Sequence, residues 1–288
     1  MKILVTGVAG QLGHDVVNEL IKRGYQPIGV DVAEMDITDK GQVDSTISKI
    51  KPDAVIHCAA WTAVDLAEEK ENEEKVYAIN ALGTKYIAEA CKNCGAKMIY
   101  ISTDYVFDGQ GTTPWTPDCK DYAPLNYYGK SKLSGEKFVS SILDNYFIVR
   151  IAWVFGKNGN NFVKTMLKLA KSYSSLRIVC DQIGTPTYTY DLAKLLCDMV
   201  VTDKYGYYHA TNEGGYISWC DFAKEIFKIK NLPIEVIPVT TKEYGVSKAQ
   251  RPFNSRLDKQ KLSEMGFDRL PSWKDALTRY ISEIDEEI

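Results

Sequence analysis

Thr6-Gly7-Val8-Ala9-Gly10-Gln11-Leu12-Gly13 is the stretch of sequence that decides the fold. It follows a short apolar run, Lys2–Thr6, and opens an amphipathic segment, Gln11–Arg23. Glycines at 7, 10 and 13 between a strand and a helix allow a tight turn and close backbone approach to a pyrophosphate. The helix N-terminus then offers free N–H groups to the phosphates. We therefore predict that Gly7, Gly10 and Gly13 bind a dinucleotide, against the alternative of an ordinary glycine-rich connection.

Short apolar runs alternate with amphipathic segments through the first half of the chain. The expected strands are Lys2–Thr6, Gln26–Val30, Ala54–Cys58, Lys97–Ile101 and Tyr146–Ile151. The expected helices are Gln11–Arg23, Lys40–Lys51, Asn72–Cys94 and Tyr128–Leu143. This alternation predicts an α/β fold with a Rossmann-like, doubly wound parallel sheet. Right-handed crossovers then place cofactor chemistry at the carboxyl ends of the strands.

The second half of the chain has a weaker rhythm, with glycine and proline interruptions between short elements. Arg177–Val179 and Val236–Pro238 look like isolated strands, and Ser272–Ile284 like a closing helix. We expect a nucleotide-binding domain over residues 1–155, rejoined by about 187–208. Residues 156–288 would then form a smaller, mainly C-terminal α+β substrate lobe.

Composition excludes several classes of protein. The 288 residues are 45% hydrophobic and 25% charged, as in a globular protein, and the net charge of −3 gives no reason to expect nucleic-acid or membrane-surface binding. The first apolar run is too short for a signal peptide, and no segment approaches the roughly 20 apolar residues of a membrane span. Seven scattered cysteines and three separated histidines favour reduced thiols, no metal centre and a cytoplasmic location.

Asp31 ends the second expected strand, eighteen residues after Gly13. A carboxylate there would accept hydrogen bonds from the adenosine ribose and repel a 2′-phosphate. No lysine or arginine lies between Asp31 and Asp39 to hold such a phosphate. Asp31 therefore favours NADH over NADPH, unless it is only an exposed turn residue.

Tyr128 and Lys132 lie four residues apart and so share one face of a helix. The same spacing occurs at two other pairs, Tyr190/Lys194 and Tyr244/Lys248. Ser102-Thr103-Asp104 closes the fourth strand on the same edge as the glycine turn, and only the first pair comes soon after it, with Tyr128 twenty-five residues after Thr103. Position therefore selects Tyr128 and Lys132 as the functional pair over a plain helix-surface pair.

This pair suits the reduction of a carbonyl group. A free tyrosine hydroxyl has a pKa of about 10, and a nearby ammonium lowers that pKa. We expect Lys132 to exert this effect on Tyr128 while it holds the nicotinamide ribose. Tyr128 would then protonate the carbonyl oxygen as general acid, and Thr103 would orient that oxygen by a hydrogen bond.

More specific motifs occur in order along nearly the whole chain. They are Gly10–Gly13, Asp36–Asp39, Ala63–Asp65, Ser102–Phe107, Tyr128–Leu133, Arg150–Gly156, Asn160–Met166, Asp181–Thr187 and Arg251-Pro252. The glycine turn, the strand that ends at Thr103 and the pair Tyr128 and Lys132 together resemble the extended short-chain dehydrogenase/reductase superfamily. The motifs quoted above resemble, within this superfamily, the dTDP-4-dehydrorhamnose reductase family, and the later ones are the more specific.

The resemblance implies reduction of the C4 ketone of dTDP-4-dehydro-6-deoxy-L-mannose (dTDP-6-deoxy-L-lyxo-4-hexulose) to dTDP-L-rhamnose. The family often accepts both NADH and NADPH. By the family pattern the catalytic residues are Thr103, Tyr128 and Lys132, and the substrate contacts are Thr103, Asp104, Trp153 and Arg251. The pattern assigns cofactor contacts, besides the glycines, Tyr128 and Lys132, to Gln11, Leu12, Asp31, Asp36, Ile37, Ala60, Trp61 and Thr62.

The chain departs from the family pattern at three positions. Trp61 replaces a histidine found in many relatives, so a backbone contact would survive there more readily than a side-chain contact. Asp15 and Tyr190 stand where some members carry glutamates that hold Mg²⁺ between subunits. We therefore expect no metal, and a monomer or weak homodimer.

Two alternatives stay open. One is an epimerase or dehydratase of the same superfamily, although a dehydratase is expected to carry Asp-Glu after the catalytic threonine, where this chain has Asp104-Tyr105. The other is a non-catalytic nucleotide-binding subunit, which would tend to lose the tyrosine or lysine that this chain keeps.

Overall fold

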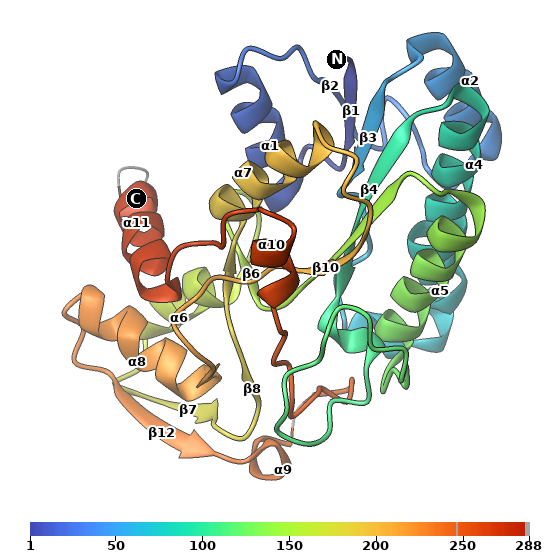
Figure 1. Ribbon diagram of the computed structural model, residues 1–288. Helices are drawn as coiled ribbons and strands as arrows, with labels where there is room; N and C mark the ends of the chain where they lie inside the picture. The colour runs from blue at the N-terminus through green and yellow to red at the C-terminus, as the bar shows by residue number, and fades with distance from the viewer. Residues whose placement is uncertain (246, 286–288) are drawn as a thin grey trace.

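A six-stranded, all-parallel sheet forms the centre of the computed structural model, which describes residues 1–245 and 247–285 (Figure 1). The remaining residues, 246 and the last three of the expected lobe, lie outside the description. The strand order is β10-β5-β4-β3-β1-β2. The bounds are β1 (Ile3–Thr6), β2 (Ile28–Val30), β3 (Ala54–His57), β4 (Lys97–Thr103), β5 (Tyr146–Ile151) and β10 (Gly206–His209). The predicted Rossmann-like α/β fold is confirmed.

The order of the strands reverses between β1 and β3. From β1 the chain moves outward to β2, crosses back to β3, and continues through β4 and β5 in the opposite direction. In open parallel sheets the crevice at such a switch point, outside the carboxyl ends of the strands, is where ligands bind. The topology therefore marks the edge at which Thr6 and His57 end their strands.

Helices cover both faces of the sheet because the strands bury side chains on both sides. In β1, Ile3 and Val5 pack toward one layer and Leu4 toward the other, as the period of two requires. The first layer contains α1 (Gln11–Lys22) and α7 (Thr189–Val200), which pack on each other. The second contains α2 (Lys40–Ile50), α4 (Thr84–Cys94) and α5 (Tyr127–Ile142) (Figure 1).

The long helix predicted over Asn72–Cys94 is interrupted. It consists of α3 (Glu73–Tyr77), a π-helical turn (Ala78–Gly83) and α4, after two 3-10 turns, η1 (Leu66–Glu68) and η2 (Lys70–Asn72). The π turn carries Asn80, whose side chain bonds both the amide of Trp61 (2.8 Å) and its carbonyl (3.1 Å). Such turns are common at functional sites. Here the turn fixes the loop that follows β3.

The C-terminal lobe has its own core and its own small sheet. β7 (Ser175–Val179) pairs in parallel with β12 (Glu235–Val239), so the prediction of two isolated strands is wrong. Each strand is too short and too exposed to be stable alone, and pairing satisfies its backbone. The lobe's core lies among α6 (Phe162–Ala170), α8 (Trp219–Ile229) and α11 (Trp273–Asp285).

Several short elements complete the fold. They are η4 (Asp104–Val106), β6 (Val154–Phe155), β8 (Ile183–Gly184), β9 (Thr187–Tyr188), β11 (Ile217–Ser218), α9 (Thr241–Tyr244) and α10 (Gln260–Glu264). β6 pairs with β9, and β8 with β11. These contacts bring the chain after β5 out to the lobe and back to the sheet at α7 and β10.

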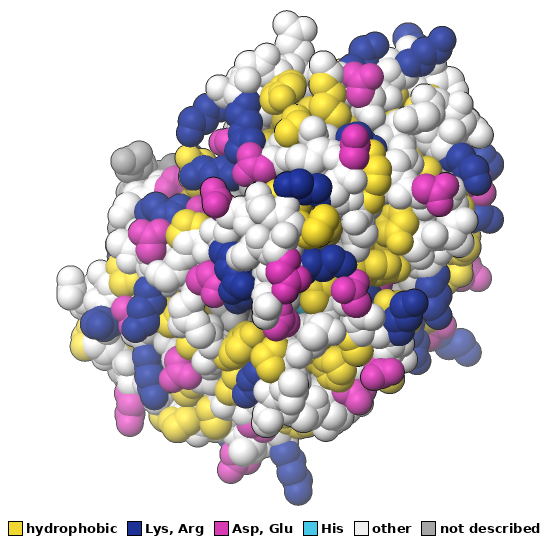
Figure 2. Space-filling model, viewed as in Figure 1, with side chains coloured by type: hydrophobic (Ala, Val, Ile, Leu, Met, Phe, Trp, Pro, Cys, Tyr) yellow, Lys and Arg dark blue, Asp and Glu magenta, His cyan; other side chains and the backbone are white. Residues whose placement is uncertain are grey.

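The surface mixes charges of both signs. On the face shown in Figure 2, lysines and arginines are interspersed with aspartates and glutamates. None of the helices in the described part of the chain has the length and hydrophobicity needed to cross a membrane. All seven cysteines are free thiols, and residues 1–245 and 247–285 hold no cluster of three or more metal-ligating side chains.

Candidate active site

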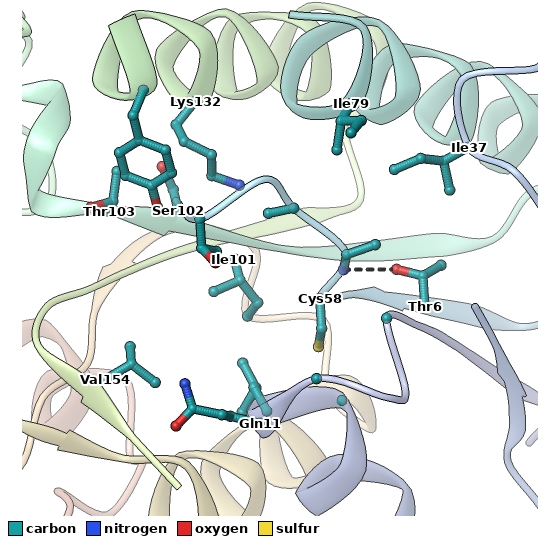
Figure 3. A pocket seen from close by; sticks show the side chains of 18 of the residues that line it. Thr6, Gln11, Ile37, Cys58, Ile79, Ile101, Ser102, Thr103, Lys132 and Val154 are labelled. Atoms are coloured by element: carbon teal, nitrogen blue, oxygen red, sulfur yellow. Dashed lines mark hydrogen bonds between the residues drawn. The ribbon is translucent and has the colours of Figure 1, made fainter. Parts of the chain in front are cut away.

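A cavity of about 920 Å³ opens at the carboxyl ends of the central strands, at the switch point of the sheet (Figure 3). Gln11 and Val154 lie on one side of the view, and Lys132 reaches toward the cavity from the helix on the other. Ser102 and Thr103 enter from the end of β4, and Ile37 and Ile79 lie farther along. The cavity therefore collects residues from elements that are distant in sequence.

The turn after β1 accepts only glycine at two positions. Gly7 has a φ of +70°, and a Cβ there would lie 2.7 Å from the Ala59 amide nitrogen. A Cβ on Gly13 would collide with the Gly7 carbonyl. Helix α1 begins next to Gly10 with no side-chain cap, so its first N–H groups stay available to an anion. Gln11 and Leu12 line the cavity beside them. This cradle fits a dinucleotide pyrophosphate.

Asp31, Asp36 and Ile37 also line the cavity. The Asp31 carboxylate accepts hydrogen bonds from the backbone amides of Ala9 and Val32, both at 2.9 Å. These bonds fix the acidic group at the end of β2, beside the glycine turn. Ile37 packs against the π turn, since a Cβ on Gly83 would lie 2.9 Å from its side chain.

The loop after β3 contributes Ala60 and Thr62 to the cavity, but Trp61 is not among the described residues that line it. The Trp61 indole N–H donates to the Ala63 carbonyl at 3.0 Å, and Lys75 lies over its ring. The prediction that Trp61 contacts the cofactor therefore depends on its backbone, which Asn80 holds in place.

Thr103 and Asp104 lie together where β4 ends. The Thr103 hydroxyl donates to Asp104 Oδ1 at 3.1 Å and accepts from the Tyr105 amide at 3.3 Å. Burial raises the pKa of the Asp104 carboxyl to about 6. Asp104 Oδ2 and the Ser102 hydroxyl are buried in the cavity wall without a hydrogen-bond partner among the described residues. Buried polar atoms without partners are costly, so both are suited to bind a polar ligand.

Tyr128 lies in the first turn of α5. Asn126 caps this helix by accepting a hydrogen bond from the Gly129 amide at 2.8 Å. A Cβ on Gly129 would collide with the Tyr105 carbonyl, so glycine lets the helix approach η4 closely. The Tyr128 ring meets the Tyr105 ring edge-on, with centroids 5.6 Å apart. Tyr128 thus lines the same cavity as Thr103.

The prediction that the Tyr128 pKa is lowered is wrong. Burial raises the pKa of Tyr128, the Asp104 carboxylate raises it further, and the Thr103 hydroxyl offsets only part of this effect. Lys132 is itself 3% exposed, and burial lowers its own pKa to about 7, against the opposing effects of Glu136 and Cys58. A lysine whose charge is suppressed in this way cannot strongly favour a phenolate.

Trp153 lies in the cavity wall with an unusual backbone, since its φ is +51°. Its indole stacks on that of Trp219, with ring centroids 3.7 Å apart and planes at 15°. It also packs on Gly184, where a Cβ would lie 3.0 Å from the ring. The C-terminal lobe therefore fixes a flat aromatic surface at the cavity.

Arg251 is not among the described residues that line the cavity. Its guanidinium makes two hydrogen bonds to the Asp65 carboxylate, at 2.7 Å and 3.1 Å. The two rival tyrosine–lysine pairs are also outside the lining. Lys194 lies over the Tyr190 ring, and Lys248 pairs with Glu69. The structure thus brings Thr103, Tyr128 and Lys132 together and leaves Arg251 in a separate ion pair.

The cavity also contains residues without an assigned role in the sequence prediction. They are Cys58, Lys75, Ile79, Ser102, Tyr105, Val154 and Asn160, among others. Cys58, Ser102 and Val154 lie at or next to strand ends, which is the signal that could have found them. Lys75 and Ile79 come from the interrupted helix, and no spacing in the sequence marks which of its faces reaches the cavity.

Comparison with known proteins places the chain in a family. The family model described as RmlD substrate binding domain matches residues 1–286. The chain belongs to this family. The spore coat polysaccharide biosynthesis protein SpsK of Bacillus subtilis is 40% identical over 98% of this chain and 97% of its own length. A dTDP-4-dehydrorhamnose reductase of Aggregatibacter actinomycetemcomitans is 40% identical over 96% of this chain and 97% of its own.

A solved structure extends the match within the RmlD family. The dTDP-4-dehydrorhamnose reductase of Bacillus anthracis, in complex with NADP, superposes with a TM-score of 0.93 at 42% identity. The match covers 98% of this chain and 99% of that one. The resemblance found in the sequence motifs is therefore confirmed over nearly the full length.

Proposed function

We propose that this member of the RmlD family reduces the C4 ketone of dTDP-4-dehydro-6-deoxy-L-mannose to dTDP-L-rhamnose, with NADH or NADPH as reductant. One observation carries the proposal: Thr103, Tyr128 and Lys132 line the same cavity as the glycine turn. The named reductases that are about 40% identical support the choice of sugar.

The nicotinamide cofactor, when bound, supplies a hydride to the carbonyl carbon. The turn at Gly7, Gly10 and Gly13 would hold its pyrophosphate, with Gln11 and Leu12 beside it. Asp31 would hold the adenosine ribose, Asp36 and Ile37 the adenine end, and Lys132 the nicotinamide ribose. The preference of Asp31 for NADH stays a prediction, and a close relative binds NADP.

Tyr128 would supply the proton. Its raised pKa keeps the phenol protonated near neutral pH, so a proton is ready when the carbonyl oxygen gains charge. The carbonyl oxygen would take that proton to give an alcohol, and Tyr128 would recover its proton from solvent. Lys132 would orient the nicotinamide ribose beside Tyr128.

Thr103, Asp104 and Trp153 would bind the sugar nucleotide. Asp104 Oδ2 and the Ser102 hydroxyl, both buried without partners, can satisfy sugar hydroxyl groups. The Trp153 indole can pack on an apolar face of the sugar that bears the C6 methyl. Arg251 would reach the diphosphate only after leaving Asp65.

The proposal also assigns cofactor binding and substrate binding to different regions of the chain. Residues 1–155, rejoined by about 187–208, would bind the cofactor, and 156–288 would provide most of the substrate lobe. The cytoplasmic location and the weak or absent self-association stay predictions of the sequence.

The decisive experiment supplies dTDP-6-deoxy-4-hexuloses together with NADH or NADPH and identifies the product sugar. We expect stoichiometric loss of the reduced-nicotinamide absorbance and formation of dTDP-L-rhamnose. An epimerase would convert the sugar without consuming reductant. A nucleotide-binding subunit would bind the cofactor and leave the sugar unchanged, and either result would refute the proposal.

A further inference from the structure

We propose that Tyr100 is a positioning residue of this site, because it holds Lys132 at both ends of that residue. The inference rests on the catalytic role proposed above for Lys132. Tyr100 lies in β4, is fully buried, and has no place in the cavity lining among the described residues. It therefore acts through the lysine and not on a ligand.

The two contacts come from different parts of the same side chain. The Tyr100 hydroxyl donates a hydrogen bond to the Lys132 carbonyl at 3.2 Å. The ammonium group of Lys132 lies over the Tyr100 ring, 4.2 Å from its centroid. An ammonium within about 6 Å of an aromatic centroid is attracted by the negative face of the ring. One tyrosine thus contacts both the backbone of the lysine, by a hydrogen bond, and its ammonium group, by a cation–π contact.

Helix α5 is shaped to admit this tyrosine. A Cβ on Gly135 would collide with the Tyr100 hydroxyl, and would lie 2.7 Å from the Asn80 carbonyl. Glycine inside a helix costs stability relative to alanine. At this position it is the residue that lets the tyrosine reach the backbone of the helix.

The Tyr100 ring also contacts a neutral imidazole, that of His57. His57 stacks on the Tyr100 ring with centroids 5.8 Å apart. His57 is held on both ring nitrogens, by Thr6 Oγ1 at 2.7 Å and Thr84 Oγ1 at 3.1 Å. Burial, and then the charge of Lys132, lower the pKa of His57 to about 3, so it carries no charge at neutral pH. Thr6 ends β1 just before the glycine turn. Direct contacts through His57 and Tyr100 therefore connect Lys132 to this turn.

The charge of Lys132 is balanced by groups from three elements. Burial opposes the ammonium, while Glu136 on α5 and Cys58 after β3 favour it. His57 on β3 is neutral, and Tyr100 on β4 stays a phenol because burial raises its pKa well above its ordinary value. The face of the Tyr100 ring therefore stabilises the Lys132 ammonium without itself changing protonation state.

The test compares Tyr100→Phe with Tyr100→Leu in the full chain. Phenylalanine keeps the ring and loses the hydroxyl, whereas leucine loses both. Tyr208→Leu is a matched control, since Tyr208 is also fully buried in the sheet and donates to a backbone carbonyl, that of Lys204. The first readout is the pKa of Lys132, from NMR titration of protein labelled with ¹³C-lysine and assigned through Lys132→Met. The second is kcat for the ketosugar.

We expect Tyr100→Leu to lower the Lys132 pKa by about one unit, because a desolvated cation–π contact is of that size. Its kcat should fall by about 10- to 100-fold, as misplaced catalytic groups do. Tyr100→Phe should keep the pKa and lose no more than about threefold in kcat. Tyr208→Leu should change neither quantity by as much as Tyr100→Leu.

The inference is overturned if the Lys132 pKa is unchanged in Tyr100→Leu. It is also overturned if the Lys132 pKa and kcat fall as far in Tyr100→Phe as in Tyr100→Leu. Equal effects from Tyr208→Leu would also overturn it, because they would show a purely structural role. If Tyr100→Leu does not fold, a fully fluorinated phenylalanine ring at position 100 keeps the shape and reverses the charge of the ring face. The fluorinated ring should lower the Lys132 pKa relative to Tyr100→Phe. An unchanged pKa would refute the contact between the ammonium and the ring face. The titration needs no substrate, so it stays decisive even if the wild-type protein does not reduce the ketosugar and the proposed function fails.

Discussion

Three ionisable side chains at the centre of the cavity have pKa values that are shifted in the direction that favours the neutral form of each group. Burial raises the pKa of Tyr128 and of Asp104, and lowers that of Lys132 to about 7. Each shift has the same cause, which is the loss of water around a charged group. A site that disfavours charge keeps a proton on its tyrosine, which is the state that a proton donor needs.

The first prediction concerns Tyr128→Phe. This change removes the proposed proton donor while keeping the ring that packs on Tyr105. We expect kcat to fall by about 10²- to 10⁴-fold, the usual contribution of a general acid, while cofactor affinity stays within about twofold. Single-turnover kinetics and cofactor titration measure the two quantities. Equal turnover in the variant and the wild type would refute the role of Tyr128.

The second prediction concerns Asp104 and pH. The pKa of its carboxyl is about 6 in the folded protein, against an ordinary value of 3.8, so the folded state holds the proton more tightly. Its contribution to stability is therefore present below pH 3.8 and is lost as pH rises through 6. Asp104→Asn removes this dependence. Between pH 4 and pH 7 the wild type should lose about 2–3 kcal/mol of unfolding free energy relative to the variant.

Urea unfolding at both pH values measures the effect. Asp118→Asn is the control, because that carboxylate is largely exposed and pairs with Lys261 at the surface. A constant difference in stability between Asp104→Asn and the wild type across this range would contradict the raised pKa.

At the scale of elements, helix α1 and its turn depend on backbone clearance. Gly13→Ala would place a methyl group against the Gly7 carbonyl, so the turn must shift. We expect a loss of about 1–3 kcal/mol in the free energy of unfolding, as for other overpacked sites, and cofactor affinity at least about tenfold weaker. Gly41→Ala, in an exposed first turn of α2, is the matched control. A variant that binds the cofactor as well as the control would contradict the prediction.

The regular elements were predictable because their periodicity is local. The predicted strand Tyr146–Ile151 matches β5, and the predicted helix Tyr128–Leu143 differs from α5 by one residue at each end. The π turn was not predictable, because it depends on the bonds from Asn80 to a loop about twenty residues earlier. The pairing of β7 with β12 depends equally on distant residues.

The candidate site shows the same limit. Thr103, Tyr128 and Lys132 could be selected because strand ends and helix faces follow from spacing. The raised pKa of Tyr128 could not, since it depends on burial by the surrounding fold and on the charge of the Asp104 carboxylate. The ion pair between Arg251 and Asp65 joins residues 186 positions apart, and no sequence pattern announces it.

At the scale of the whole molecule, this ion pair connects the loop after β3 to the C-terminal segment. Asp65 also accepts a hydrogen bond from the Ala249 amide at 3.0 Å, and Lys248 pairs with Glu69 beside it. The Arg251 and Asp65 side chains are 27% and 43% exposed, so the pair contributes no more than about 1 kcal/mol to stability. Its weakness allows a diphosphate to compete with Asp65 for the arginine.

The corresponding prediction is that Arg251→Gln raises KM for the nucleotide sugar about tenfold, with kcat little changed, because one charge-assisted contact is lost. Lys248→Gln removes the neighbouring ion pair and should leave KM unchanged. Steady-state kinetics at saturating cofactor measures both variants. An unchanged KM in Arg251→Gln would exclude a contact between Arg251 and the diphosphate.

Strand β10 has a consequence for how the chain is made. It is supplied by Gly206–His209, and it pairs with β5, which ends about fifty residues earlier. Helix α7, which covers one face of the sheet, also comes from this later part. On the ribosome, a nascent chain that stops near residue 155 has an open sheet edge and an uncovered apolar face. At about 5–20 residues per second, several seconds of further synthesis are needed before β10 and α7 can complete the sheet and cover its face. During that interval the nascent chain is most open to chaperones and to self-association.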